Sequence, residues 1–422
     1  MKNSTVVLAL ALAAMFSLSA KAELLDRPAG IQIGQRMTLY PSVAFSIGYD
    51  SNPGSIHGRN GGDDDGGDMM FVVSPAFNLT YRAEKWSLLL NGYYNYTGYT
   101  KSEYAEQHNR HSYGEDLRWN WANSSGGEKG WAIVLGQGFK QETMADEFTS
   151  TSGAGYQNDS RQLQLSGAVQ RQFNTEWHGD INASYYWLDY LDNDNSPVAS
   201  RSSFYGWQRW NIGFDAGFAP SQWTDIMING QYHGYKQDNV DQYDLDDNSQ
   251  GYSLQFGLGS YMTERISYRA LIGWSRFEYA GGESTSDGFV YTLSGNWKIG
   301  ETWNTMILAT SYYQPSERQQ ASKSRVDAIG WALSKSLVSG KLTAALDLRY
   351  HRDTNEYIMG EGYDYTIDVI TGALSLNYSF NRILAAFVRG EYQRSFNSED
   401  DSRNNAYDYD RWRATVGIRL SY

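Results

Sequence analysis

The chain has 422 residues, contains no cysteine and carries a formal net charge of −13. Disulfide bonds are therefore excluded, and no nucleic acid partner is expected for so acidic a chain. A mean hydropathy of −0.58 suggests a soluble protein, but 15% aromatic residues, with 33 tyrosines, 14 tryptophans and 42 glycines, are typical of pleated strands with aromatic girdles at membrane interfaces.

Residues 1–22 have the pattern of a secretory signal peptide. A lysine precedes an apolar stretch over residues 6–18, and residues 20–22 form a small-x-small cleavage site. We therefore expect an exported chain, and the absence of any cysteine after the cut argues against a lipid anchor. Residues 23–35 are expected to form a short periplasmic lead within a single barrel domain over residues 23–422.

Beyond this leader, apolar and polar residues alternate in about eighteen runs, with roughly sixteen to eighteen strands compatible with the pattern. Residues 36–50 form the first run, and residues 412–422 form the last, which ends on a terminal aromatic. Alternation in a strand places one set of side chains on each face. Several arginines share the polar face of the last run, so that face must line water while the other meets lipid. The sequence predicts an all-β transmembrane antiparallel up-and-down barrel with both termini periplasmic.

Short polar connections alternate with long ones along the chain. The short connections, such as residues 83–85 and 174–176, are predicted to be periplasmic turns, and many are followed at once by tryptophan. An indole at the start of a strand places its apolar ring at the membrane and its N–H in the headgroup layer. The predicted belt of membrane-interface aromatics consists of Trp86, Trp131, Trp177, Trp223, Trp303 and Tyr422.

The long connections concentrate Asp, Asn, Gly and Ser and are expected on the extracellular side. The first of them, residues 50–68, carries a glycine and aspartate insert and is predicted to fold inward as a constriction loop. An acidic rim would enrich cations at the mouth and could share divalent metal with lipopolysaccharide. No dedicated metal site is expected, because the acidic stretches lack the glycine and distal glutamate of an EF-hand loop. The charged residues of the predicted constriction are Asp63, Asp64, Asp65 and Asp68.

The face that alternation assigns to the lumen mixes cations with a few acids and with Asn, Gln, Ser and Thr. Opposite charges across a wide aqueous pore create a transverse field that orients water and rejects apolar solutes. The residues predicted to line the pore are Arg82, Arg118, Lys140, Arg209, Asp215, Lys298, Asp347, Arg349, Arg389, Glu391, Arg411, Arg413 and Arg419.

Two segments near the start of the expected mature chain resemble a known family. Residues 39–43 (Leu-Tyr-Pro-Ser-Val) lead into residues 48–53 (Gly-Tyr-Asp-Ser-Asn-Pro), and residues 73–79 read Val-Ser-Pro-Ala-Phe-Asn-Leu. This stretch is similar to the start of the β-barrel porin 2 family, in which a Tyr-Asp-x-Asn motif ends the first strand and whose members often occur with exopolysaccharide genes. The resemblance covers the first two predicted strands and implies an outer-membrane barrel with a porin or polysaccharide-export role.

Together these features favour a porin-like channel in the bacterial outer membrane for passive diffusion of small hydrophilic solutes or saccharides. The alternative is a barrel that exports or anchors exopolysaccharide with periplasmic partners. An enzyme such as a barrel lipase or protease is not expected, because none of the six histidines lies in a recognisable catalytic motif. The expected partners are membrane lipid, lipopolysaccharide and the barrel assembly machinery, with no cofactor; the sequence leaves the oligomeric state open.

Overall fold

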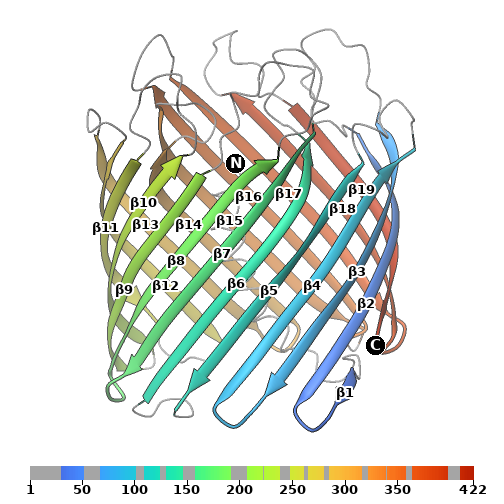
Figure 1. Ribbon diagram of the computed structural model, residues 1–422, viewed down its shortest axis with the longest axis horizontal. Helices are drawn as coiled ribbons and strands as arrows, with labels where there is room; N and C mark the ends of the chain where they lie inside the picture. The colour runs from blue at the N-terminus through green and yellow to red at the C-terminus, as the bar shows by residue number, and fades with distance from the viewer. Residues whose placement is uncertain are drawn as a thin grey trace.

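The computed structural model describes most of the chain, and every regular element in the described part is a β-strand (Figure 1). No helix within that part is long and apolar enough to cross a membrane. The expected signal peptide over residues 1–22 lies outside the described residues. The described ranges are residues 30–51, 67–100, 109–123, 130–145, 157–191, 207–221, 223–237, 248–260, 265–279, 285–315, 322–338, 340–357, 364–397 and 409–422.

These ranges contain nineteen strands. Their bounds are β1 (Ile31–Ile33), β2 (Met37–Asp50), β3 (Asp68–Arg82), β4 (Trp86–Tyr99), β5 (Arg110–Ala122), β6 (Gly130–Ala145), β7 (Gln157–Gln172), β8 (Trp177–Leu191), β9 (Trp207–Ser221), β10 (Thr224–Gln237), β11 (Asn248–Gly259), β12 (Ile266–Glu278), β13 (Thr285–Ile299), β14 (Trp303–Pro315), β15 (Ser322–Leu337), β16 (Leu342–Tyr357), β17 (Tyr365–Ser379), β18 (Leu384–Asn397) and β19 (Tyr409–Ser421).

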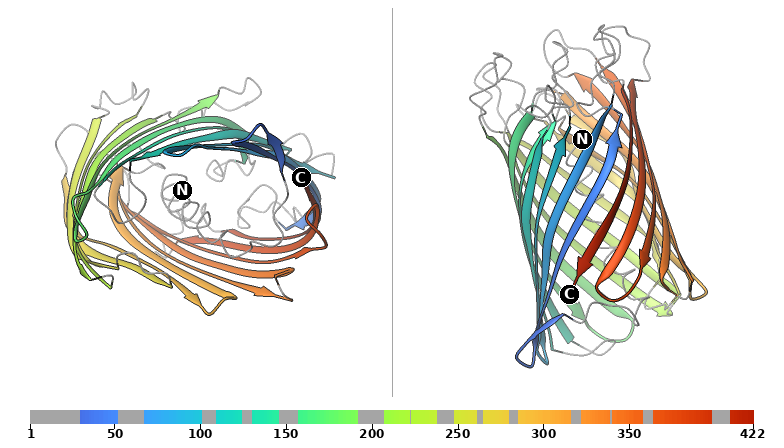
Figure 2. Two further views of the ribbon diagram at one scale, coloured as in Figure 1. Left: turned by 90° about the horizontal axis from the view of Figure 1, so that it is seen from below. Right: turned by 90° about the vertical axis from the view of Figure 1, so that its right-hand side faces the viewer.

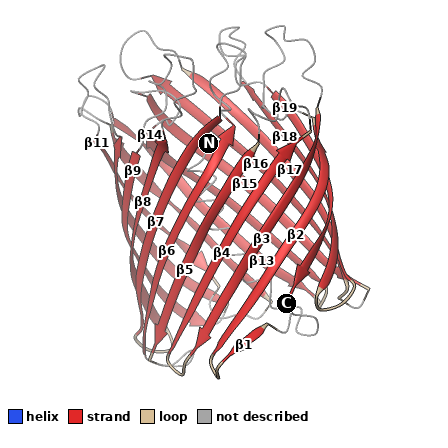
Figure 3. Ribbon diagram, turned by 45° about the vertical axis from the view of Figure 1, so that its right-hand side comes forward, coloured by secondary structure: helices blue, strands red, loops and turns tan. Residues whose placement is uncertain are grey.

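Strands β2 to β19 form one closed antiparallel barrel. Each strand pairs with its neighbours in the sequence, and β19 pairs with β2 from Arg413↔Asp50 to Ser421↔Ser42, which closes the sheet. The expected all-β barrel of about eighteen strands is thus confirmed. Strand β1, within the expected periplasmic lead, pairs with the start of β2 and lies at the same end of the barrel as the C-terminus (Figures 1 and 3).

The two faces of the wall have opposite chemistry. Large apolar side chains at alternate positions are exposed on the outside; Ile181 is 65% exposed and Phe256 is 62% exposed. The intervening positions point inward and carry most of the Asn, Gln, Ser and charged residues of the strands. Closing the sheet leaves no edge strand facing lipid, so nearly all backbone groups pair within the wall.

The barrel has an oval cross-section (Figure 2). Strands from the middle of the chain, coloured green to yellow, form one end of the oval, and the first and last strands, coloured blue and red, form the other end. The wall curves most sharply at these two ends, so inward side chains of neighbouring strands converge there.

Candidate functional site on the inner wall

All the residues predicted to line the pore lie on the inner face of the strands. In β3, for example, Met69, Phe71 and Phe77 are exposed outside, and Arg82 has the opposite parity. In β19 Trp412 is 49% exposed outside, which leaves Arg413 inside. The structure therefore agrees with the predicted orientation, while the effect of these side chains on a solute stays a prediction.

Several of these inner charges neutralise one another within the wall. Arg349 donates from Nε to Asp347 Oδ1 at 2.7 Å, two residues along the same face of β16. Arg389 donates in the same way to Glu391 Oε1 at 2.7 Å in β18. Lys140 pairs with Glu142, and Arg269 with Asp215. A charge paired this closely contributes little to a field across a wide lumen, because its partner cancels it locally.

Arg411 is a structural residue at the barrel closure, which corrects its assignment as a pore-lining charge. Its side chain is only 5% exposed, and its Nε donates to Asp50 Oδ1 at 2.9 Å. Arg413 Nε and the Tyr99 hydroxyl each donate to Asp50 Oδ2 at 2.9 Å. The closure cluster, defined as Asp50, Tyr99, Arg411 and Arg413, therefore holds β2, β4 and β19 together on the inner face.

The predicted constriction loop is only partly described. Asp63, Asp64 and Asp65 lie outside the described residues. Asp68 is the first residue of β3, which corrects its assignment to a loop. Its side chain is buried, and its Oδ1 accepts a hydrogen bond from Thr100 Oγ1 at 2.7 Å. Asp68 therefore belongs to the wall.

The predicted interface aromatics lie at the ends of strands that are joined by short turns. Trp86 begins β4 and stacks on Tyr81 with ring centroids 4.6 Å apart. Trp303 begins β14, and Lys335 Nζ lies 4.2 Å from its ring centroid. This placement agrees with a belt at one membrane interface. The other aromatics of this set are exposed on the outside, namely Trp131, Trp177, Trp223 and Tyr422.

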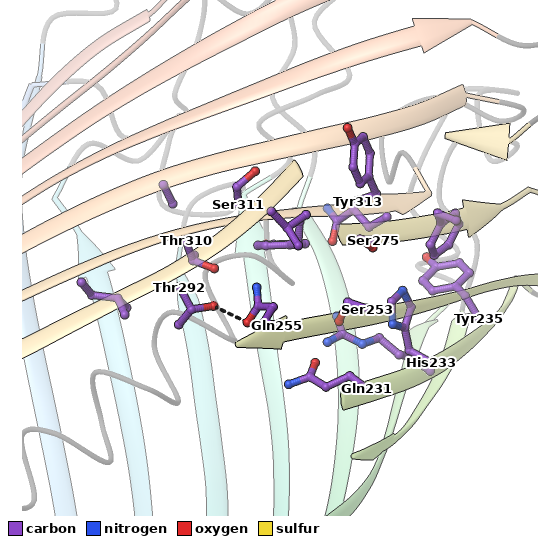
Figure 4. Close-up of a pocket in the computed structure, with 17 residues that line it drawn as sticks. Gln231, His233, Tyr235, Ser253, Gln255, Ser275, Thr292, Thr310, Ser311 and Tyr313 are labelled. Atoms are coloured by element: carbon purple, nitrogen blue, oxygen red, sulfur yellow. Dashed lines mark hydrogen bonds between the residues drawn. The ribbon is translucent and has the colours of Figure 1, made fainter. Parts of the chain in front are cut away.

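A cavity of about 250 Å³ lies on the inner wall between β9 and β15 (Figure 4). Its lining combines the rings of His233, Tyr235 and Phe277 with amide and hydroxyl groups from neighbouring strands. Thr292 Oγ1 donates to Gln255 Oε1 at 3.3 Å within it. We call this cavity the β9–β15 pocket.

Buried aromatic rings support this pocket from one side. Trp207 stacks between Tyr186 and Tyr235 with centroid distances of 4.8 and 5.2 Å, and His233 stacks on Phe277 at 5.3 Å. Trp207 is only 4% exposed and Phe277 is fully buried, although both lie on the inner face. Sequence reasoning missed this cluster because it considered mainly the charged and polar residues of the inner face and did not show which inward rings meet. The available signal was large apolar residues at inward positions.

Among the described residues that line the pocket, Arg209 carries a positive charge and is surrounded by neutral side chains. Its cross-strand neighbours are Tyr186 and Tyr235, and Trp207 and Asn211 flank it on the same face of β9. No carboxylate occurs among the described lining residues. A guanidinium in a partly apolar wall attracts an anion more strongly than one exposed to bulk water, because water screens it less.

No protein-family model matches the chain, and no curated protein matches it. Among solved structures, the chain is similar to the siderophore receptor PirA from Pseudomonas aeruginosa, with 8% identity and a TM-score of 0.45, over 94% of this chain and 85% of that one. It is also similar to the FrpB iron transporter from Neisseria meningitidis, with 11% identity and a TM-score of 0.48, over 92% of this chain and 82% of that one. A third similar structure is the alcaligin receptor FauA from Bordetella pertussis, with 9% identity and a TM-score of 0.39, over 93% of this chain and 77% of that one.

The functional expectation from the sequence, a passive porin or an exopolysaccharide-export barrel, is not borne out by these comparisons. The solved structures are described as a siderophore receptor, an iron transporter and an alcaligin receptor, not as passive diffusion porins or exopolysaccharide-export barrels. At this identity the likeness concerns the fold alone, so no cargo is transferred.

The barrel lies in the bacterial outer membrane. A closed sheet with an exposed apolar outer face is the architecture that satisfies backbone hydrogen bonds in lipid. The outer face therefore contacts lipid. The resemblance of the first two strands to the β-barrel porin 2 family stays a prediction.

Proposed function

We propose that this barrel is a selective outer-membrane uptake protein with a saturable site for a small organic monoanion, a carboxylate carried on an apolar body. The observation that carries the proposal is the β9–β15 pocket, in which the Arg209 guanidinium stands in a wall of rings, amides and hydroxyls. Mostly apolar pockets with a few placed polar groups are the usual form of small-molecule sites.

The size of the pocket limits the ligand. An apolar cavity of about 150 Å³ holds one benzene molecule, so a pocket of about 250 Å³ suits a ligand of roughly ten non-hydrogen atoms. Arg209 can bind a carboxylate through two parallel N–H donors. The partly exposed rings of Tyr312 and Tyr313 offer apolar surface for the rest of the molecule, and Gln231 adds an amide.

Charge and burial together favour binding over free diffusion. A carboxylate that meets a partly desolvated guanidinium gains a charge-assisted hydrogen bond worth about 1.5–3 kcal/mol. An apolar body gains about 25 cal/mol for each Å² removed from water. A hydrophilic solute of the same size lacks the second contribution, so the site should discriminate against it and saturate with the amphipathic one.

The test is isothermal titration of the purified barrel with 3-phenylpropionate and with its neutral amide. We expect the carboxylate to bind the native barrel about ten- to a hundredfold more tightly than the amide, and Arg209→Gln to remove that preference. Arg118→Gln is the matched control, because Arg118 is an inner-face arginine outside the pocket that donates to Asn120. Equal affinity for the two probes in the native barrel, or no binding of either, would overturn the proposal.

A further inference from the structure

The hydrogen-bond ladder between β13 and β14 ends early. It holds eight residue pairs, from Ile299↔Trp303 to Thr292↔Thr310. On their other edges the two strands are paired over a greater length. β13 forms thirteen residue pairs with β12, and β14 forms thirteen residue pairs with β15. Residues 285–291 of β13 and 311–315 of β14 therefore face each other without a described ladder. We call this interval the β13–β14 seam.

The β9–β15 pocket extends into this seam. Ser311, Tyr312, Tyr313 and Gln314, four consecutive residues of β14, all line it (Figure 4). In a paired strand only every second side chain reaches one face, so a run of consecutive lining residues means that the cavity wraps around the edge of β14. The Ser311 hydroxyl is buried and has no hydrogen-bond partner within the described part of the chain.

The outer side of the seam is covered by a polar contact. Tyr291 of β13 reaches across β14 and donates from its hydroxyl to Asp327 Oδ1 of β15 at 3.3 Å. Arg325 Nε donates to Asp327 Oδ2 at 3.1 Å and holds that carboxylate. Asp327 is the register partner of Ser311, so the Tyr291 side chain passes over the unpaired edge.

The seam lies at the level of the membrane surface. Phe289 and Trp274 are cross-strand partners that are 50% and 53% exposed on the outer face, and aromatic side chains of this kind mark the interface between headgroups and acyl chains. Tyr291 lies two residues from Phe289 toward the centre of the wall. The seam therefore begins below the interface and opens toward the extracellular end.

An unpaired strand edge is unfavourable in lipid unless it lines a cavity or is covered by protein. The pocket covers the inner side of this edge and the Tyr291–Asp327 contact covers the outer side. Local opening costs least where few backbone hydrogen bonds hold a segment. The seam should therefore separate more easily than the paired parts of β13 and β14, and it joins a partly apolar pocket to the outer leaflet.

We propose that the β13–β14 seam is a lateral passage through which an amphipathic ligand moves between the pocket and the outer leaflet, and that the Tyr291–Asp327 contact is its latch. The identity of the ligand rests on the proposed function. The passage itself can be tested without any ligand, so failure of one proposal is distinguishable from failure of the other.

The test uses single thiols, which is possible because the chain has no cysteine. Ser311→Cys places a thiol in the seam, and Ala309→Cys places one two residues away on the same face of the same strand, inside the ladder. Ser311 is 2% exposed and Ala309 is 9% exposed, so static exposure would favour reaction at position 309. Each variant is reconstituted in phosphatidylcholine vesicles that carry an N-dodecyl maleimide.

We expect S311C to react with the lipid-borne reagent at least about tenfold faster than A309C, because segments with fewer hydrogen bonds open more often. Adding Tyr291→Phe should accelerate S311C further, whereas Tyr392→Phe, which removes a similar outer-face bond to Asp410, should not. Equal rates at the two positions, or reaction of S311C only with a membrane-impermeant maleimide, would overturn the passage. An unchanged rate with Y291F would overturn the latch.

A heat-dependent gel shift verifies that each variant is a folded barrel. Should S311C fail to fold, Val290→Cys supplies a thiol on the opposite edge of the seam, buried at 2% exposure, and its matched control is then Thr292→Cys, two residues away on the same face and inside the ladder. None of these labelling rates depends on Arg209 or on the probe used for binding. The seam and the binding site therefore succeed or fail separately.

Discussion

Asp50, the last residue of β2, is bound by Arg411 of β19, which lies 361 positions further along the chain. The two strands are the first and last of the barrel, and their pairing is the step that closes it. Asp50 is fully buried and also accepts bonds from Arg413 and Tyr99. One carboxylate thus compensates two guanidinium groups at the closure, so its loss should be felt by the whole barrel.

Asp50→Ala should destabilise the folded barrel by about 3–5 kcal/mol, because removing one partner of a buried pair leaves an uncompensated buried charge. The measurement is the urea midpoint of the refolded barrel, followed by circular dichroism. Arg411→Gln in the same chain should recover part of the loss, since it removes the stranded charge.

The matched control for this experiment is Glu391→Ala. It breaks the Arg389 pair, whose side chains are 51% and 36% exposed, and exposed pairs contribute about 1 kcal/mol or less. Similar midpoints for the Asp50 and Glu391 variants would show that the closure cluster does not stabilise the barrel.

The two faces of one strand should tolerate charge very differently. Ile181 of β8 is 65% exposed on the outer face, and Asn182, the next residue, points inward and donates to Asp180. Ile181→Arg should cost about 2–4 kcal/mol in a bilayer, as expected for a cation near the midplane. Asn182→Arg should cost much less, because it faces Asp180 and water. Refolding yield in vesicles at increasing urea measures both, and equal costs would contradict the assigned faces.

Much of the wall could be predicted from the sequence because alternation is a local property. The inward positions of β19, including Arg411, Arg413 and Arg419, follow from parity alone. The tryptophans that follow short turns predicted the first residues of β4, β8 and β14 to within one residue. Parity does not reveal which inward side chains meet, and that is where the sequence reasoning was incomplete.

The functional features depend on contacts between side chains of different strands. The stacking of Trp207 on Tyr235, the Asp50–Arg411 pair and the early end of the β13–β14 ladder each depend on register and on the sharp curvature at the ends of the oval. No single strand encodes them. Paired charges were likewise predicted to act across the lumen, because the sequence does not show that Asp347 and Arg349 bind each other.

Removal of Tyr422 should impair assembly in cells. The backbone N–H of Tyr422 donates to the Pro41 carbonyl at 3.0 Å, and its side chain is 53% exposed on the outside. The terminal aromatic therefore fixes the end of the closing strand and adds to the interface belt. Surface levels of the folded form, read by the heat-dependent gel shift, should fall. Tyr422→Phe keeps the ring and should restore them, whereas normal levels of the truncated chain would contradict this role.

The aromatic stack behind the pocket should contribute more to stability than an equally large residue on the lipid face. Trp207 is 4% exposed between Tyr186 and Tyr235, and Trp274 is 53% exposed outside. Trp207→Ala should cost about 3–5 kcal/mol, because it leaves a cavity among packed rings. Trp274→Ala removes a ring that already meets lipid and should cost less. Urea midpoints from circular dichroism compare the two, and a larger loss for Trp274→Ala would show that the inner aromatic cluster is not a packed core.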